Sequence, residues 1–209
     1  MALRRRLRDG VDAPGAPLPI SLIAAELRLS PTPIREALSR LAGEELVEKI
    51  GPNYTRPSYD ASTLAELYDL RWIYLAAVLS PDPHRRSGRQ ASMSGHENVG
   101  AYDYAGGLDE HGPERVVEKL FCDVVADAGD VSLARAFMRV NERLAPLQVL
   151  EARVFADVRA EATQLVQAQQ FGDRPGLRAA VRRYHRRRSI GAVSLARLSD
   201  PRKYRPDIV

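Results

Sequence analysis

Polar side chains lie along one side of a short amphipathic segment, residues 31–42. Arg35 and Ser39 are four residues apart and share a face when this segment is helical. Ile34 and Leu38 belong to a separate apolar stripe with helical spacing. An arginine presented in this way can make bidentate contacts to guanine O6 and N7 or to a phosphate. The polar residues of the segment are Thr32, Arg35, Glu36, Ser39 and Arg40.

The neighbouring elements must position this polar face. A helix is predicted over 20–28, a short turn follows, and Ser30 is a suitable N-cap for a second helix over 31–42. Short strands over 46–50 and 54–56 flank a turn rich in Gly and Pro and predict a small β-wing. This order indicates a winged helix-turn-helix, whose second helix enters the major groove of DNA. Amphipathic helical hairpins are common, so periodicity alone does not establish DNA binding.

A family resemblance strengthens this interpretation. The segment Ile23–Leu41, followed by Glu45-Leu46-Val47, resembles the DNA-binding head of the GntR family. The family pattern is roughly L-A-x-x-L-G-V-S-R-T-P-V-R-E-A-L-x-R-L, then G-L-V. The resemblance implies that Arg35 is the main DNA anchor, with Ser30, Thr32 and Pro33 also facing DNA. We therefore expect a DNA-binding set that comprises Ser30, Thr32, Pro33, Arg35, Ser39, Arg40, Asn53 and Tyr54.

The sequence departs from the GntR pattern at informative positions. Pro31 stands where the family usually has Arg, so a cationic side chain and an N–H donor are both missing. Arg28 replaces the glycine before the turn, and Asn53-Tyr54 replaces the usual Arg-Gly tip of the wing. We therefore expect DNA binding that is weaker than, or different in sequence preference from, that of a typical member.

The second half resembles, more faintly, the all-helical FCD effector domain of the FadR subfamily. The resemblance implies that Arg71 faces an effector pocket. Many such domains bind a divalent metal through one Asp and three His, but here Glu118 and Cys122 replace two ligands and Ala162 a third. The last His ligand of the family aligns with Tyr184, and His185 comes one residue later. One residue is about 100° around a helix, so His185 is expected to point away from the ligand position. No bound metal is therefore expected, although a divalent metal is the less favoured alternative. The effector-binding set is Arg71, Glu118, Cys122 and His185.

The expected fold class is mainly α, with an N-terminal winged helix-turn-helix domain and an all-α helical bundle. The predicted helices of the bundle cover residues 64–79, 114–128, 131–154, 156–171 and 175–198. The predicted organisation is a DNA-binding domain over 1–57, a linker over 58–63, a helical effector and dimerisation domain over 64–198 with a long irregular loop over 80–113, and a tail over 199–209.

Charge and composition constrain the class of protein. Residues 178–209 hold ten Lys and Arg against two Asp and Glu, whereas residues 1–57 hold nine against seven, so basicity does not single out the head. The run Arg182–Arg188 is expected to be a solvated face with some internal pairing. His84, His96 and His111 have no metal-ligand spacing and are expected to be solvated. One cysteine, no signal peptide and no bilayer-length apolar run predict a cytoplasmic protein that is not in a membrane.

These features predict a DNA-binding transcription regulator, a repressor, that binds a palindromic operator on double-stranded DNA as a homodimer. A small anionic molecule is the expected effector. An effector-independent, metal-free DNA-binding and dimerisation protein is the alternative. A small helical enzyme is a remote one, because the sequence shows no converging set of His, Asp and Glu and no nucleophile motif.

Overall fold

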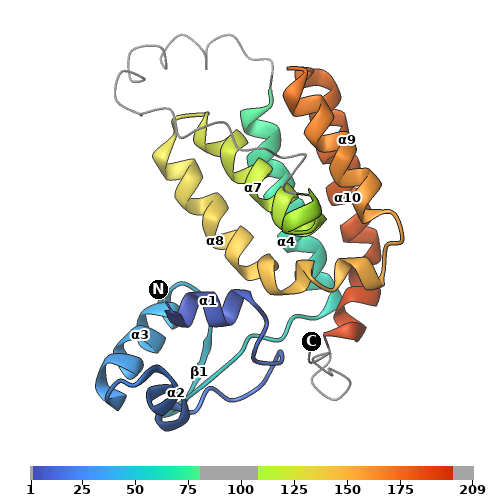
Figure 1. Ribbon diagram of the computed structural model, residues 1–209. Coiled ribbons are helices and arrows are strands. Elements are labelled where there is room, and N and C mark those ends of the chain that lie inside the picture. Colours follow the sequence, from blue (N-terminus) through green and yellow to red (C-terminus); the bar gives the residue numbers. More distant parts are fainter. Residues whose placement is uncertain (1, 81–107, 200–209) are drawn as a thin grey trace.

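A computed structural model describes residues 2–80 and 108–199 of the chain. It has a small head at the N-terminus and a larger helical bundle, with the head packed below one end of the bundle (Figure 1). The head contains α1 (Ala2–Arg8), α2 (Ile20–Leu27), α3 (Pro31–Gly43), β1 (Glu48–Ile50) and β2 (Asn53–Thr55). The bundle contains α4 (Ala61–Val78), α7 (Pro113–Ala126), α8 (Val131–Gln148), the 3-10 turn η1 (Glu151–Arg153), α9 (Val158–Gln170) and α10 (Arg174–Leu198).

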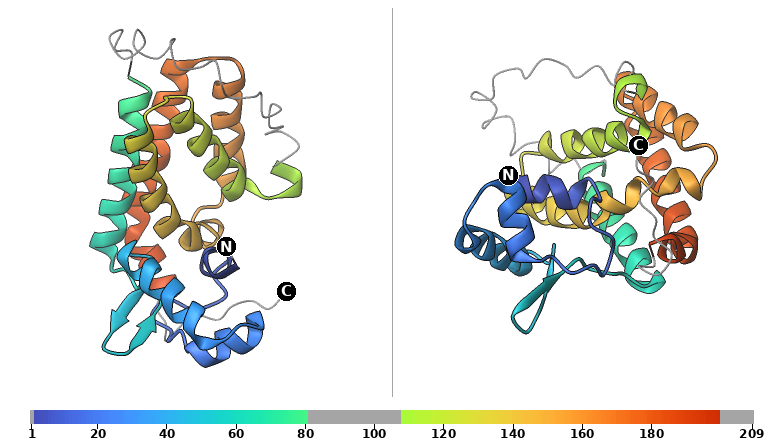
Figure 2. Two further views of the ribbon diagram at one scale, coloured as in Figure 1. Left: turned by 90° about the vertical axis from the view of Figure 1, so that its left-hand side faces the viewer. Right: turned by 60° about the horizontal axis from the view of Figure 1, so that its bottom comes forward.

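The head is the predicted winged helix-turn-helix. Its core is formed by apolar residues that recur along α2 and α3, including Ile23, Ile34 and Leu38, and by Leu3 and Leu7 of α1. The strands β1 and β2 pair antiparallel, with Glu48 opposite Thr55 and Ile50 opposite Asn53. Figure 2 shows this hairpin projecting from the head as a wing.

The bundle is organised around the long helices α4 and α10, which lie side by side (Figure 2). Helix α4 also contacts α7 and α8, and α7 in turn contacts α9, so one side of α4 is covered by other helices while its outer side stays exposed. The aromatic residues Tyr68, Phe121 and Phe137 are fully buried between these helices. None of the helices in the described ranges is long and apolar enough to cross a bilayer.

Several boundaries differ from the sequence expectations for physical reasons. Helix α4 begins at Ala61, within the expected linker, because the Asp60 side chain accepts a 2.8 Å hydrogen bond from the Thr63 N–H and caps it. The helix expected over 131–154 ends at Gln148, and a separate 3-10 turn follows over Glu151–Arg153. Most of the loop expected over 80–113 lies outside the described residues, together with His84 and His96. At its described end, Leu108 to Glu110 are helical, Leu108 is buried and His111 is exposed.

Candidate nucleic-acid interface and buried polar centre

Helix α3 buries one stripe and presents the other to solvent. Ile34, Leu38 and Leu41 are at most 4% exposed and anchor the helix in the core of the head. Ser30 is the N-cap by position, but its side chain makes no capping hydrogen bond and is exposed. The predicted DNA-facing residues of this helix are all exposed in the described head: Thr32, Pro33, Arg35, Ser39 and Arg40.

The wing differs from the expectation at one residue. Asn53 is exposed at the tip, as a contacting residue must be, but Tyr54 is only 3% exposed and packs in the core of the head. Tyr54 is therefore corrected from a DNA contact to a residue that holds the wing against the helices. Lys49 on β1 is exposed and was missed by the sequence analysis. The available signal was that it is the only lysine in residues 1–57.

The backbone of the head follows the GntR pattern even where its side chains depart from it. Arg28 ends α2 in the left-handed conformation, with φ 54° and ψ 43°, and Glu45 after α3 has φ 62°. Both residues stand where the family pattern has glycine, which adopts such angles without steric cost. A residue with a side chain pays on the order of 1 kcal/mol there. The backbone at the two positions where the family pattern has glycine thus keeps a positive φ in this chain, although neither residue is glycine.

Four residues predicted to bind an effector come together in the bundle. The Arg71 guanidinium is fully buried, and its Nε donates a 3.0 Å hydrogen bond to His185 Nε2. Its Nη1 donates to Asn141 Oδ1 at 3.3 Å, and Asn141 Nδ2 donates to Glu118 Oε1 at 2.8 Å. Asn141 Nδ2 also lies 3.8 Å from Cys122 Sγ. We call Arg71, Glu118, Cys122, Asn141 and His185 the polar centre; Asn141 was missed by the sequence analysis and had no motif that could reveal it.

The orientation expected for His185 was wrong. Its ring is 1% exposed and faces Arg71, because α10 buries a stripe wide enough to include both Tyr184 and His185. His185 Nδ1 lies 2.7 Å from the Val181 carbonyl, so Nδ1 carries the proton and Nε2 is the acceptor for Arg71. Burial, and then the positive charge of Arg71, hold the pKa of His185 well below its usual value. The ring is therefore neutral at physiological pH.

The remaining groups of the polar centre are also tied into the protein. Burial raises the pKa of the Cys122 thiol to about 12, so the thiol is protonated and a poor metal ligand. Within the described residues, no group of three His, Cys, Asp or Glu side chains could hold a metal ion. Arg71 Nη2 is buried and has no hydrogen-bond partner among the described residues. This orphaned donor is thus a buried cationic N–H that the described residues leave unpaired.

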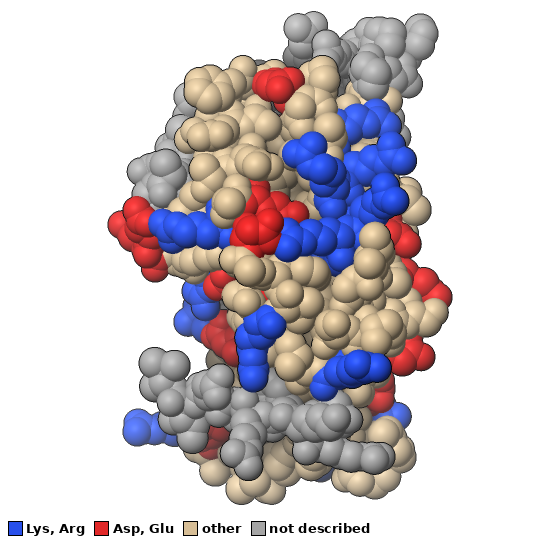
Figure 3. All heavy atoms as spheres, turned by 90° about the vertical axis from the view of Figure 1, so that its right-hand side faces the viewer, with Lys and Arg blue, Asp and Glu red and all other residues tan. Residues whose placement is uncertain are grey.

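A second buried ionic cluster lies at the middle of α10. Arg188 is 1% exposed, and its guanidinium pairs with Glu151 at 2.8 Å and also with Glu161 at 2.5 Å. Glu151 accepts further hydrogen bonds from Tyr68 at 2.8 Å and Tyr184 at 3.1 Å. The expectation of a solvated Arg182–Arg188 run therefore holds for Arg182, Arg183 and Arg186, which are exposed, but is wrong for Arg188. Figure 3 shows basic side chains gathered on one flank of the bundle.

Ion pairs join the head to the bundle. Most of their side chains are partly exposed, so each pair contributes at most about 1 kcal/mol. The exception is Glu118, whose side chain is 7% exposed and which links Arg8 of the head to Asn141 of the polar centre. The pairs are Arg4 with Glu142, Arg8 with Glu118, Arg143 with Glu45 and Arg115 with Asp9.

Comparison with known proteins agrees with this geometry. Residues 1–51 match the model of a family described as bacterial regulatory proteins, gntR family. The head is therefore a GntR-family helix-turn-helix domain, and the matched family is one of regulators rather than enzymes. No curated protein is significantly similar in sequence to this chain.

Solved structures share the fold of both units. E. coli McbR/YncC is similar with a TM-score of 0.65 and 19% identity, over 92% of this chain and 94% of that one. A structure described as a transcriptional regulator GntR from Rhodococcus sp. RHA1 is similar with a TM-score of 0.62 and 20% identity, over 92% and 94% of the two chains. These similarities confirm the predicted fold class, a winged helix-turn-helix followed by a helical domain.

Proposed function

We propose that this protein is a cytoplasmic transcription regulator, a repressor, that binds a palindromic operator as a homodimer. The observation that carries the proposal is the α3 face, where Arg35, Ser39 and Arg40 are exposed on a helix anchored by Ile34 and Leu38. A helix presented in this way fits the major groove, where arginine reads guanine. The GntR match of residues 1–51 supports the same role for this face.

Arg35 is expected to anchor the head on its site. The Arg35→Ala variant should lose about 1–3 kcal/mol of preference for the operator over unrelated DNA, because a bidentate contact to a base is removed. Fluorescence anisotropy with a duplex from the promoter upstream of the protein's own gene, at moderate salt, measures this preference. Arg135→Ala is the matched control, because Arg135 is an exposed arginine of α8 in the bundle. Equal preference in the wild type and Arg35→Ala would contradict the role of Arg35, and no sequence preference in the wild type would contradict the proposed function.

The outer side of the α4–α10 pair supports homodimerisation. Ile73, Ile190 and Val193 are 58%, 72% and 50% exposed there. Asp69 of α4 and Ser189 of α10 line one shallow hollow between the two helices, and Ile73 and Val193 follow them by four residues on the same faces. Two copies that bury this apolar surface together would place two heads on one palindrome.

A charged substitution tests this interface. Ile190→Glu should convert the dimer to a monomer, because a symmetric interface would bury two unpaired carboxylates. Sedimentation velocity over a range of concentrations measures the change, and Val131→Glu, at an exposed valine at the start of α8, is the control. A wild-type protein that is monomeric at every concentration would refute the dimer.

The proposed effector is a small anion that binds at the polar centre. Its support is the orphaned Nη2 of Arg71 and the chain of contacts from Asn141 through Glu118 to Arg8 of the head. Such a ligand would act by favouring one of two arrangements of the heads, one that binds DNA and one that does not. The free energy of DNA binding can change by no more than the difference in the ligand's binding free energy between these two arrangements. The effector-independent regulator is the alternative, because Arg71, Asn141 and Glu118 already hydrogen-bond one another. An operator affinity that no small carboxylate alters would favour this alternative.

A further inference from the structure

The turn between α2 and α3 carries an arginine whose side chain has no partner in the described structure. Arg28 ends α2 with φ 54° and ψ 43°, and its backbone N–H donates to the carbonyls of Ala24 and Ala25. The side chain is exposed and forms no ion pair, hydrogen bond or ring contact with any described group. Glycine adopts this backbone conformation at a lower cost than any residue with a side chain. Neither the backbone nor the packing therefore accounts for an arginine here, and such an outlier points to a use for the side chain.

Arg28 stands at one end of an exposed rim that leads into the DNA-facing side of α3. Every residue from 28 to 33 is exposed, and so is Arg35, one turn into the helix. Arg28 and Pro31 are three residues apart, at most about 11 Å of chain. Each strand of a duplex has one phosphate about every 3.4 Å along the axis. When the start of α3 enters the major groove, a backbone phosphate therefore lies within reach of Arg28.

The first turn of α3 is poor in groups that could hold a phosphate. Pro31 and Pro33 have no backbone N–H and no charge. They remove two of the four N–H groups that a helix leaves without an intrahelical partner at its start. A guanidinium placed just before this turn supplies both the positive charge and the donors that the prolines lack.

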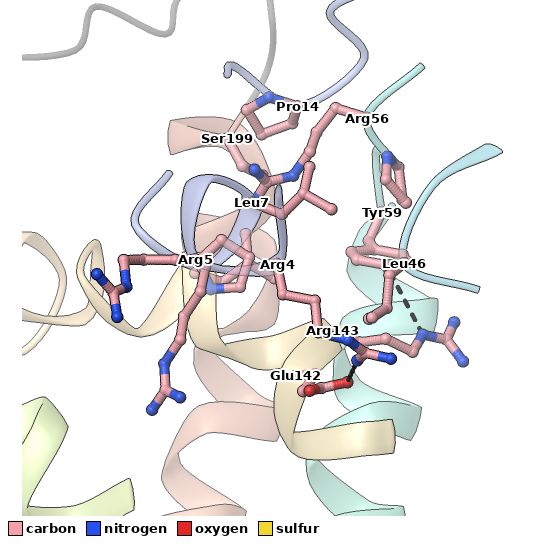
Figure 4. A pocket seen from close by; sticks show the side chains of 14 residues that line it. Arg4, Arg5, Leu7, Pro14, Leu46, Arg56, Tyr59, Glu142, Arg143 and Ser199 are labelled. Atoms are coloured by element: carbon pink, nitrogen blue, oxygen red, sulfur yellow. Dashed lines mark hydrogen bonds and ion pairs between the residues drawn. The ribbon is translucent and has the colours of Figure 1, made fainter. Parts of the chain in front are cut away.

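Several other arginines of the head are already engaged. Figure 4 shows Arg4 of α1 directed to Glu142 of α8, and the two side chains pair at 2.6 Å. Arg8 pairs with Glu118 of the bundle, and Arg6 pairs within the head. Since phosphate neutralisation supplies much of the affinity for DNA, the cations that remain unpaired matter most. The exposed cations of the head that form no ion pair with a described group are Arg5, Arg28, Arg35, Arg40 and Lys49.

We propose that Arg28 binds a phosphate of the DNA backbone beside the bases that α3 reads. A phosphate contact positions the head on the duplex and carries no sequence information. Its role thus differs from that of Arg35, which is expected to distinguish the operator from unrelated DNA. The proposal rests on the proposed function of the α3 face, but the contact itself can be measured on any duplex.

Fluorescence anisotropy of the full-length protein tests the contact on the promoter duplex and on an unrelated duplex, from about 50 to 200 mM salt. Arg28→Gln removes the charge and keeps a side chain at the same backbone position. It should weaken binding to both duplexes by about three- to tenfold per head and lower the slope of log K against log salt concentration by about 0.9 per head. The ratio of the two affinities should stay that of the wild type. Arg28→Lys keeps a charge and should keep the wild-type slope.

Arg28→Gly separates the contact from an effect on folding. Glycine takes the positive φ without steric cost, so the midpoint of urea unfolding should equal or exceed that of the wild type. DNA binding should nevertheless fall as it does in Arg28→Gln. Glu45→Gly is the matched control, because Glu45 is exposed and is the other described non-glycine residue with a positive φ, 62°. It removes no positive charge and should not lower the slope.

The outcomes distinguish this contact from the proposed function. Equal slopes for the wild type and Arg28→Gln, or a slope for Arg28→Lys as low as that for Arg28→Gln, overturn the contact. A lower operator preference in Arg28→Gln overturns it as well, because Arg28 would then read bases. A wild type that binds both duplexes equally contradicts the proposed function, whereas a lower slope in Arg28→Gln still supports the phosphate contact. A wild type that binds neither duplex overturns both.

Discussion

Replacing Arg188 with alanine is expected to destabilise the bundle by about 3–5 kcal/mol, enough to remove much of the stability of a domain of this size. The reason is the charge that remains. Glu151 is 3% exposed, and Arg188 is its ionic partner at 2.8 Å. Without the guanidinium, this carboxylate stays in a low-dielectric interior with only the Tyr68 and Tyr184 hydroxyls as donors. The packing of Arg188 over the Tyr184 ring, 3.4 Å from its centroid, is lost as well.

Urea unfolding followed by far-ultraviolet circular dichroism measures this loss. Arg187→Ala is the matched control, because Arg187 directly precedes Arg188, is partly exposed, pairs with Asp157 at the surface and approaches Glu161 only to 3.9 Å. Its replacement should cost no more than about 1 kcal/mol. The double variant Arg188→Met with Glu151→Gln should recover part of the stability lost in Arg188→Met alone, since no unpaired charge remains at Glu151. A cost for Arg188→Ala equal to that for Arg187→Ala would show that the cluster is not a buried ionic network.

Lowering the pH below about 6.5, the usual pKa of histidine, is expected to destabilise the protein through His185. The unfolded chain binds a proton at this histidine below that value, whereas burial and the nearby Arg71 lower the pKa of the folded ring well below it. The folded state therefore holds fewer protons than the unfolded state, and stability falls as the pH falls. The full contribution is present above pH about 6.5. Each unit below it removes up to about 1.4 kcal/mol until the folded ring itself is protonated.

Comparison with a variant that cannot titrate isolates this contribution. His185→Gln keeps an oxygen that can accept the Arg71 hydrogen bond, and its unfolding free energy should fall less steeply than that of the wild type between pH 6.5 and 4.5. His111→Gln, at an exposed histidine, is the control and should follow the wild type. Parallel profiles for the wild type and His185→Gln would mean that the ring is not held neutral.

Much of the head could be predicted from the sequence, because its signals are local. The apolar spacing of Ile34, Leu38 and Leu41 orients α3, and Pro31 and Pro33 are compatible with its first turn. Orientation within one helix is set by the 100° step between residues, so exposed Arg35 and Ser39 follow from the same pattern. Arg28 and Glu45 show how strongly that pattern fixes the backbone, since both adopt the angles expected of glycine.

Burial of single polar residues could not be predicted in this way, because it depends on which surface from elsewhere covers them. Arg188 belongs to a run of arginines. Its guanidinium can be buried because Glu151 and Glu161, which lie on other elements, form ion pairs with it and offset the cost of its desolvation. His185 faces Arg71 because α4 packs along α10, a contact 114 residues apart in the chain. The sequence places Tyr54 at the tip of the wing, whereas in the structure its side chain packs in the core of the head.

The sequence by itself determined the kind of head and the order of the helices, since these depend on periodicity and on a family pattern. The tertiary structure alone decided the Arg188 cluster, the partnership of Arg8 with Glu118 and the contact of Arg71 with His185. Each of these joins segments far apart in the chain. These contacts arise from the packing of whole elements, which no local spacing encodes.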